Sequence, residues 1–174
     1  ITITGCEFVN SGGVLGMENV TVSFLAGQDA NRLYSFDNFK MTDCVVTGCE
    51  TGLGLSAQGG WKSVEVSGNV FTDVGFVAVL VGSEGAVWGD DMRDPAVYQP
   101  LQSGVNIHDN TFRTIRDTTY TKPSGAVNAI AVWGEGVNIH NNYIEDVDSV
   151  SFTDTEGIYV KAVNFDVHNN VLLN

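Results

Sequence analysis

A short segment at residues 87–94 gathers chemically active side chains. It reads Val-Trp-Gly-Asp-Asp-Met-Arg-Asp, with three carboxylates and one arginine beside Trp88. The neighbours Asp90 and Asp91 repel each other when both are ionised, so one of them can keep its proton and act as a general acid. A pair of carboxylates is also the minimal equipment for glycoside hydrolysis. The segment therefore predicts a catalytic pair, with a plain surface turn and a Ca²⁺ site as the alternatives.

Aromatic and basic residues farther along the chain complete the predicted site. Aromatic rings offer flat faces on which a sugar ring can stack, and we expect four of them to bind substrate: Trp88, Tyr120, Trp133 and Tyr159. Arg116 and Lys161 are the predicted cationic catalytic residues, because a cation can neutralise a substrate carboxylate and a lysine can serve as a base. The alternative is that Trp133 packs under a loop and Lys161 is an ordinary surface charge.

A repeated pattern of alternating apolar residues must position these side chains. In its four clearest copies the pattern ends in Asn, and an apolar residue follows two places later: Val64–Asn69, Val105–Asn110, Val137–Asn142 and Phe165–Asn170. Three earlier copies lack the Asn: Ile1–Cys6, Val20–Leu25 and Phe39–Cys44. Alternation at period two buries one face of a strand. Repetition of such strands at intervals of tens of residues predicts a solenoid of stacked coils.

The Asn that ends each copy has a predicted structural role. It interrupts the alternation, so it marks a tight corner in which its amide can satisfy backbone groups left unpaired by the bend. Coils stack about 4.8 Å apart, so the amides can form a ladder of Asn69, Asn110, Asn142 and Asn170. The residues Cys6, Leu25 and Cys44 continue this column in the first three coils. An outward column of His108, His140 and His168 predicts rings stacked at the surface rather than a metal site.

A second recurring strand precedes the strand that ends in Asn. Its copies lie at residues 52–55, 75–78, 129–133 and 157–161, a series that aligns Leu53, Phe76, Ile130 and Ile158. This alignment places Trp133 beside Lys161, and Ala131 beside Tyr159. The ladder spacing lengthens from 25 residues (44 to 69) to 41 residues (69 to 110) and is still 32 residues in the next coil (110 to 142). The excess predicts two loop insertions, at residues 83–103 and 116–128.

Composition limits the kinds of molecule that the chain is expected to bind. The 174 residues carry a net charge of −13 with only eight Lys and Arg, which argues against nucleic acids and anionic membranes. The same charge disfavours a polyanionic substrate unless Ca²⁺ bridges the two, and no other cofactor is expected. The sequence has no run of 18 apolar residues, so it predicts no membrane span.

The cysteines and the two chain ends lead to further expectations. The three cysteines predict no disulfide framework, because Cys6 and Cys44 would share a column two coils apart, about 9 to 10 Å. All three are expected to be small buried residues. Residues 1–174 form one expected domain. It begins and stops inside the strand pattern without a polar cap, which predicts a fragment of a longer β-helix or ends covered by a homo-oligomer.

The copies at residues 105–112 and 137–144 resemble the repeats of right-handed parallel β-helix proteins of the pectate-lyase-like superfamily, which includes polysaccharide lyases, glycosidases and phage tailspikes. The resemblance implies an all-β, right-handed, single-stranded solenoid of about seven coils, with substrate lying along the first sheet. By the same resemblance, the first sheet here is the series of strands that aligns Leu53, Phe76, Ile130 and Ile158. Gly89-Asp90-Asp91 is similar to the Asp-Asp element of family 28 glycosidases, whereas their Gly-His-Gly and Arg-x-Lys elements are absent.

The function implied by the resemblance is that of a carbohydrate-active protein. It would bind a polysaccharide and cleave or modify it as a polysaccharide lyase or a glycoside hydrolase, outside the cell or on a virion surface. The alternative is a non-catalytic structural segment, such as a virion fibre, an adhesin or a glycan-binding surface. Fold alone does not choose between the two.

Overall fold

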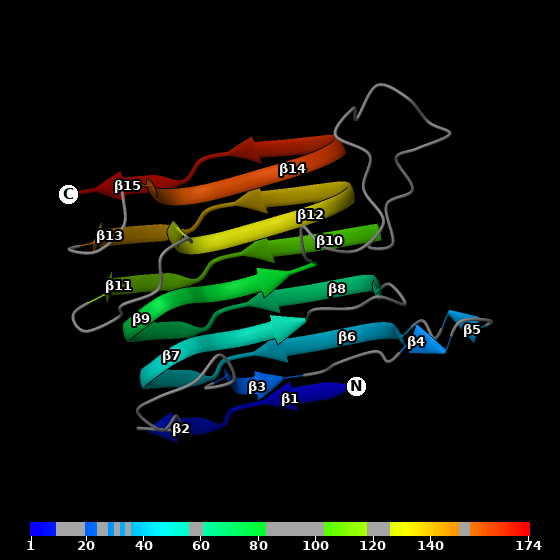
Figure 1. Ribbon diagram of the computed structural model, residues 1–174, viewed down its shortest axis with the longest axis horizontal. Helices are drawn as coiled ribbons and strands as arrows, with labels where there is room; N and C mark the ends of the chain where they lie inside the picture. The colour runs from blue at the N-terminus through cyan, green and yellow to red at the C-terminus, as the bar shows by residue number, and fades with distance from the viewer. Residues whose placement is uncertain are drawn as a thin grey trace.

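The chain forms a parallel β-helix. The computed structural model describes residues 1–9, 20–23, 28–29, 32–33, 36–55, 61–82, 103–117, 126–149 and 154–174. All regular structure in these ranges is β-strand. Thirteen of the strands belong to one parallel sheet that coils upon itself, so that successive coils stack (Figure 1). A separate antiparallel pair, β4 (Gln28–Asp29) and β5 (Arg32–Leu33), stands apart from the stack.

We divide the coiled sheet into three parts, the first, second and third sheets. The second sheet contains the strands that lead to the corner. In stacking order these are β1 (Thr2–Thr4), β6 (Phe36–Thr42), β8 (Trp61–Ser67), β10 (Ser103–His108), the latter half of β12 (Ala126–His140) and that of β14 (Asp154–His168). The register aligns Met41, Val66, Ile107 and Ile139, all fully buried in the core. The predicted inward face of this sheet is therefore confirmed.

The third and first sheets follow the corner. The third sheet contains β2 (Glu7–Val9), β7 (Val45–Leu55), β9 (Val70–Val81), β11 (Thr111–Asp117), β13 (Tyr143–Ser149) and β15 (Val171–Leu173). The first sheet consists of β3 (Val20–Ser23) with the later parts of β7 and β9 and the early parts of β12 and β14. These four long strands bend from one sheet to the next (Figure 1).

The predicted asparagine ladder is confirmed. Asn69 Nδ2 donates to Asn110 Oδ1 at 2.9 Å, Asn110 Nδ2 donates to Asn142 Oδ1 at 3.0 Å, and Asn142 Nδ2 donates to Asn170 Oδ1 at 2.9 Å. Each side chain also bonds backbone groups at the corner; Asn142, for example, donates to Ile107 O and accepts from Asn110 N. The amides thus satisfy the backbone groups that the bend leaves without partners.

Left-handed backbone marks three further columns. One lies just before the ladder (Gly5, Asp43, Gly68, Asp109, Asn141, Asn169), a second within the strands that lead to the corner (Asn38, Ser63, Gly104, Gly136, Asn164), and a third within the third sheet (Gly48, Asp73, Thr114, Asp146). Gly, Asn and Asp tolerate this conformation best. Their recurrence at equivalent positions explains how every coil turns at the same places.

Two details of the predicted register are wrong. The described part of the predicted copy Val20–Leu25, β3 (Val20–Ser23), does not join the second sheet, because it pairs with Thr51–Gly54 of the first sheet. A Val-x-Val alternation suits any strand, and Leu25 offers no corner amide to distinguish the sheets. The first-sheet series also shifts: Leu53 aligns with Val79, not Phe76. An irregularity between Cys49 and Thr51 changes the register at this point.

The first correction brings two cysteines together. Since β1 pairs directly with β6, Cys6 and Cys44 lie in neighbouring coils rather than two coils apart. Cys44 and Cys49 are buried as expected, whereas Cys6 is exposed. Of the predicted insertions, residues 83–102 and 118–125 lie outside the described residues.

Candidate functional site

The candidate site on the first sheet is built by β12 and β14. These strands pair in register from Ala126 to His140, and the pairing aligns Trp133 with Lys161 and Ala131 with Tyr159. Because the strands are parallel and in register, residues 28 positions apart in the sequence become neighbours. The two alignments that the sequence predicted are therefore present.

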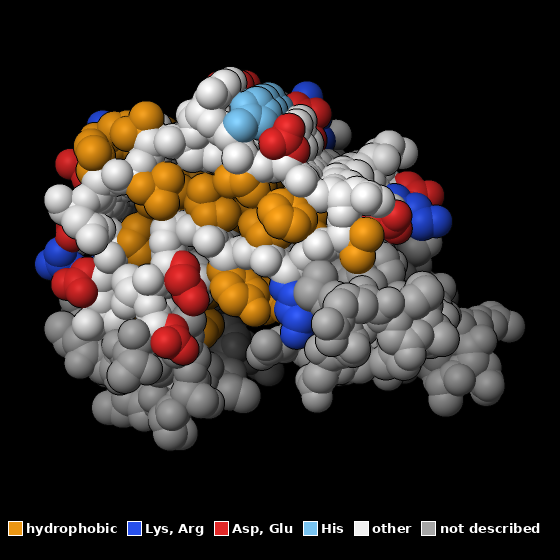
Figure 2. All heavy atoms as spheres, turned by 90° about the horizontal axis from the view of Figure 1, so that it is seen from above, with side chains coloured by type: hydrophobic (Ala, Val, Ile, Leu, Met, Phe, Trp, Pro, Cys, Tyr) orange, Lys and Arg blue, Asp and Glu red, His pale blue; other side chains and the backbone are white. Residues whose placement is uncertain are grey.

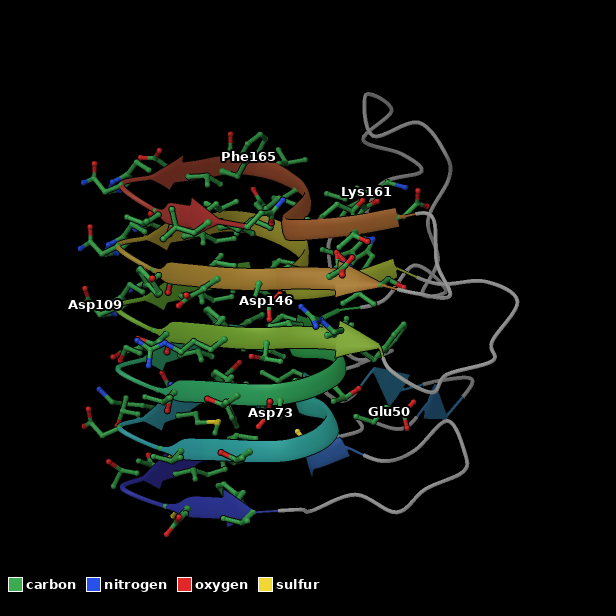
Figure 3. All side chains as sticks on the ribbon, turned by 90° about the vertical axis from the view of Figure 1, so that its left-hand side faces the viewer. Glu50, Asp73, Asp109, Asp146, Lys161 and Phe165 are labelled. Carbon is green, nitrogen blue, oxygen red and sulfur yellow. The ribbon has the colours of Figure 1, made fainter. Side chains whose placement is uncertain are left out.

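An aromatic pair lies at the centre of this site. The ring centroids of Trp133 and Tyr159 lie 5.2 Å apart with the planes tilted by 47°, a spacing at which aromatic rings attract each other. Both side chains are half-buried. Lys161 is also half-buried, at the edge of the stack (Figure 3). The site thus combines two apolar ring faces with one cation.

Buried polar atoms without hydrogen-bond partners lie on the same sheet. Trp133 Nε1 and Glu156 Oε2 are both buried and make no hydrogen bond. Such atoms are rare in folded proteins and need a physical reason, such as a ligand or an ordered water. The same kind of atom also occurs on the second and third sheets, at Asn106 Oδ1, Asn138 Oδ1 and Arg116 Nε, so it is not particular to the first sheet.

Glu156 carries the perturbed carboxyl of this region. Burial raises the pKa of Glu156, and the nearby Asp154 charge raises it further. On β14 it alternates in phase with Ile158 and Val160, which pack against the core, so its environment is less polar than the open surface. Its phase with these apolar residues is the signal in the sequence that indicates burial.

Arg116 lies apart from the aromatic pair. It is in β11, where its Nη2 forms an ion pair with Asp146 of the next coil, and its Nε is buried without a partner. Asp146 lies on the face of the third sheet that is turned toward the viewer in Figure 3, whereas Lys161 lies at the right-hand edge. The guanidinium is thus engaged on the third sheet.

The remaining predicted site residues fall in other segments of the chain. Trp88, Asp90, Asp91 and Tyr120 lie outside the described residues. The acidic residues of β13 are engaged locally: Glu145 accepts a hydrogen bond from Tyr143 Oη at 3.1 Å and lies 3.6 Å from Arg113 Nε. Glu145 is therefore paired on the surface of the third sheet and is not part of the candidate site on the first sheet.

The histidine column lies on the second sheet, as predicted. The rings of His108 and His140 stack at 4.9 Å, and those of His140 and His168 at 5.0 Å, each pair within 2° of parallel. Figure 2, which looks along the stack, shows the histidines one behind another. Parallel rings direct their nitrogens side by side rather than toward one point. In the described part of the chain, no three His, Cys, Asp or Glu residues are grouped to hold a metal ion.

The class of this protein is defined by its fold, because comparisons with known proteins found no match among protein-family models, curated proteins or solved structures. The described ranges also contain no helix long and apolar enough to cross a membrane. The stacked parallel sheets and the asparagine ladder therefore place the protein among parallel β-helices.

Proposed function

We propose that the protein binds a polysaccharide along the first sheet, with Trp133 and Tyr159 as the platform for sugar rings. The observation that carries this proposal is the tilted aromatic pair, 5.2 Å between centroids, beside the half-buried Lys161. Ring faces stack on the apolar faces of sugars, and the indole N–H of Trp133 makes no hydrogen bond within the protein. The strong negative charge favours a neutral glycan.

The binding proposal is tested with Trp133→Ala and a matched control. We expect Trp133→Ala to weaken retardation in gels that contain neutral polysaccharides by at least tenfold in apparent Kd, about 1.4 kcal/mol. Tyr143→Ala removes an aromatic residue from the third sheet and should bind as the wild type does. Equal binding by all three proteins would show that the platform has no role, and a loss in both variants would show that the effect is not specific to the first sheet.

Cleavage is a second proposal, which follows the resemblance to the right-handed pectate-lyase-like superfamily. Asp90, Asp91 and Lys161 are its candidate catalytic residues, and Arg116 belongs to it only if its pair with Asp146 opens. Glu156 stays outside this proposal, because it shares the core-facing phase of Ile158 and Val160 and so lies on the opposite face of β14 from Lys161. In this proposal the protein acts outside the cell or on a virion surface.

The cleavage proposal has its own test. Asp90→Asn and Asp91→Asn are each assayed for release of reducing ends or unsaturated products from the glycan that binds. A loss of at least a hundredfold in one variant, with binding retained, supports cleavage. Binding by the wild type without any product from a broad glycan panel would instead favour the alternative of a non-catalytic adhesive or fibre segment.

A further inference from the structure

Two cysteines stack at the first corner of the helix. Cys6 lies between β1 and β2, and Cys44 lies at the equivalent position between β6 and β7. Backbone hydrogen bonds on both sides hold the two corners together: Gly5 N donates to Thr42 O at 3.1 Å, and Val45 N donates to Cys6 O at 2.9 Å. The pair is therefore fixed in register in neighbouring coils.

The spacing of the two residues suits a covalent bridge. Neighbouring parallel strands lie about 4.8 Å apart, within the range of about 4.4–6.8 Å between Cα atoms that a disulfide spans. Cys44 Sγ lies 3.4 Å from Cys6 N. Because the nitrogen and Cβ of Cys6 are bonded to the same Cα, this sulfur lies close to the space that the Cys6 side chain sweeps when it rotates.

Little holds the two thiols in their present positions. Each donates only a weak hydrogen bond to the carbonyl two residues earlier, Cys44 Sγ to Thr42 O at 3.3 Å and Cys6 Sγ to Thr4 O at 3.4 Å. Cys6 is exposed, and β1 is the last strand on its side of the described sheet. The first corner can therefore shift by the small amount that a bridge requires.

We propose that Cys6 and Cys44 form a reversible disulfide that joins the first two coils under oxidising conditions. The oxidant is a low-molecular-weight disulfide such as oxidised glutathione. The Cys6 thiolate attacks one of its sulfurs, forms a mixed disulfide and releases the first small thiol. The Cys44 thiolate then attacks the Cys6 sulfur and releases the second. Two protein thiols lose two protons and two electrons, and the oxidant becomes two thiols.

The exposure of each cysteine sets the order of these steps. Cys6 meets the oxidant first, because Cys44 is only 1% exposed. Burial raises the pKa of the Cys44 thiol, so the closing step should accelerate as the pH rises. Cys49 is also buried, but it aligns with Val74 in the third sheet rather than with a cysteine. It serves as the internal control.

The test uses the whole folded chain. The protein is incubated with oxidised glutathione, unfolded, alkylated and digested with trypsin, which separates Cys6 from the other cysteines by cleaving at Arg32 and Lys40. We expect most of the Cys6 peptide to be linked to the peptide that starts at Met41, with one alkylated cysteine remaining. Cys49→Ser should give the same link, which assigns it to Cys44.

A second variant shows which outcome overturns the proposal. In Cys44→Ser, Cys6 should stop as the mixed disulfide with glutathione, and the linked peptide should disappear. If wild-type Cys6 also accumulates as the mixed disulfide, or links to Cys49 or to a second molecule, the proposal is wrong. Reduction with dithiothreitol should restore three alkylatable thiols in the wild type.

Discussion

Thr114 is the residue least suited to its backbone conformation. Its φ is 55°, in the left-handed column that it shares with Gly48, Asp73 and Asp146. A β-branched side chain in this region is a genuine outlier, because its Cβ substituents crowd the backbone. The other members of the column have residue types that tolerate the turn, so Thr114 is a local source of strain.

We expect Thr114→Asn to stabilise the protein by about 1 kcal/mol, since Asn tolerates the left-handed region. The melting temperature should rise by about 2–4 °C for a chain of this size. Thr111→Asn, at the start of the same strand, is the matched control and should give no gain. A lower melting temperature for Thr114→Asn would show that the threonine makes a compensating contact.

His140 is the centre of the stacked histidines, and it predicts a pH dependence. Burial lowers the pKa of His140, and the neighbouring His108 and His168 lower it further, while Asp109 and Asp166 partly oppose them. The unfolded chain, with a value near 6.5, thus binds the proton more readily than the native protein does. Stability from this residue is present above pH 6.5 and is lost as the pH falls below it.

Urea denaturation at pH 7.5 and pH 5.5 measures this effect. The wild type should lose more stability over the interval than His140→Asn, which has no titrating ring at the centre of the stack. An NMR titration should also show that His140 is protonated at lower pH than an imidazole in an unfolded peptide. An equal loss in both proteins would assign the pH dependence to other groups.

At the level of the elements, the ladder holds neighbouring coils in register. Asn142 is 1% exposed, donates to Ile107 O and Asn170 Oδ1, and accepts from the backbone and side chain of Asn110. Its removal leaves several buried groups without partners, each costing about 1–3 kcal/mol. The hydrogen bonds that are lost are the ones that keep neighbouring coils aligned.

We therefore expect Asn142→Ala to cost about 3 kcal/mol in the free energy of unfolding. Asn138→Ala is the matched control: the Asn138 Oδ1 has no partner, so its removal should be nearly neutral. Chemical denaturation of the two variants gives the difference directly. Similar losses in both would mean that the ladder contributes no more than an amide outside it.

The elements also show what the sequence could predict. The asparagine corners were predictable because an amide in a break of alternation has few other roles. The register of the first sheet was not, because Gly52-Leu53 and Gly75-Phe76 read alike and the irregularity near Cys49 leaves no mark in the pattern. The same ambiguity led Val20–Leu25 to the wrong sheet, since only the corner residue distinguishes one strand from another.

For the site, the sequence predicted the pairing of strands better than the use of side chains. Trp133 and Lys161 align because strand register follows from the repeat. The partner of Arg116 depended on which way one long side chain turns, and an acid in the next coil, Asp146, was close enough to bind it. Trp88, Asp90, Asp91 and Tyr120 stay predictions from residue type alone.

At the scale of the whole molecule, charge opposes compactness. The excess carboxylates that give the net charge of −13 repel one another when the chain folds. Added salt shortens the range of this repulsion from about 30 Å at 0.01 M to about 8 Å at 0.15 M. We expect the melting temperature at pH 7 to rise between these NaCl concentrations. A fall would indicate that the surface pairs, such as Lys40 with Glu65, outweigh the general repulsion.

The asparagine ladder has a direction. Each of the amides of Asn69, Asn110 and Asn142 donates one hydrogen to the Asn of the coil that follows and the other to a backbone carbonyl of the coil before. Each Oδ1 accepts from the coil before, beginning with Asn69 Oδ1, which accepts from Cys44 N. The amide dipoles therefore point the same way and reinforce one another along the axis. Removal of one ladder Asn therefore affects the two neighbouring coils unequally. The preceding coil then has N–H donors without an acceptor. In the following coil, an Asn Oδ1 loses one donor but still has lone pairs that can accept.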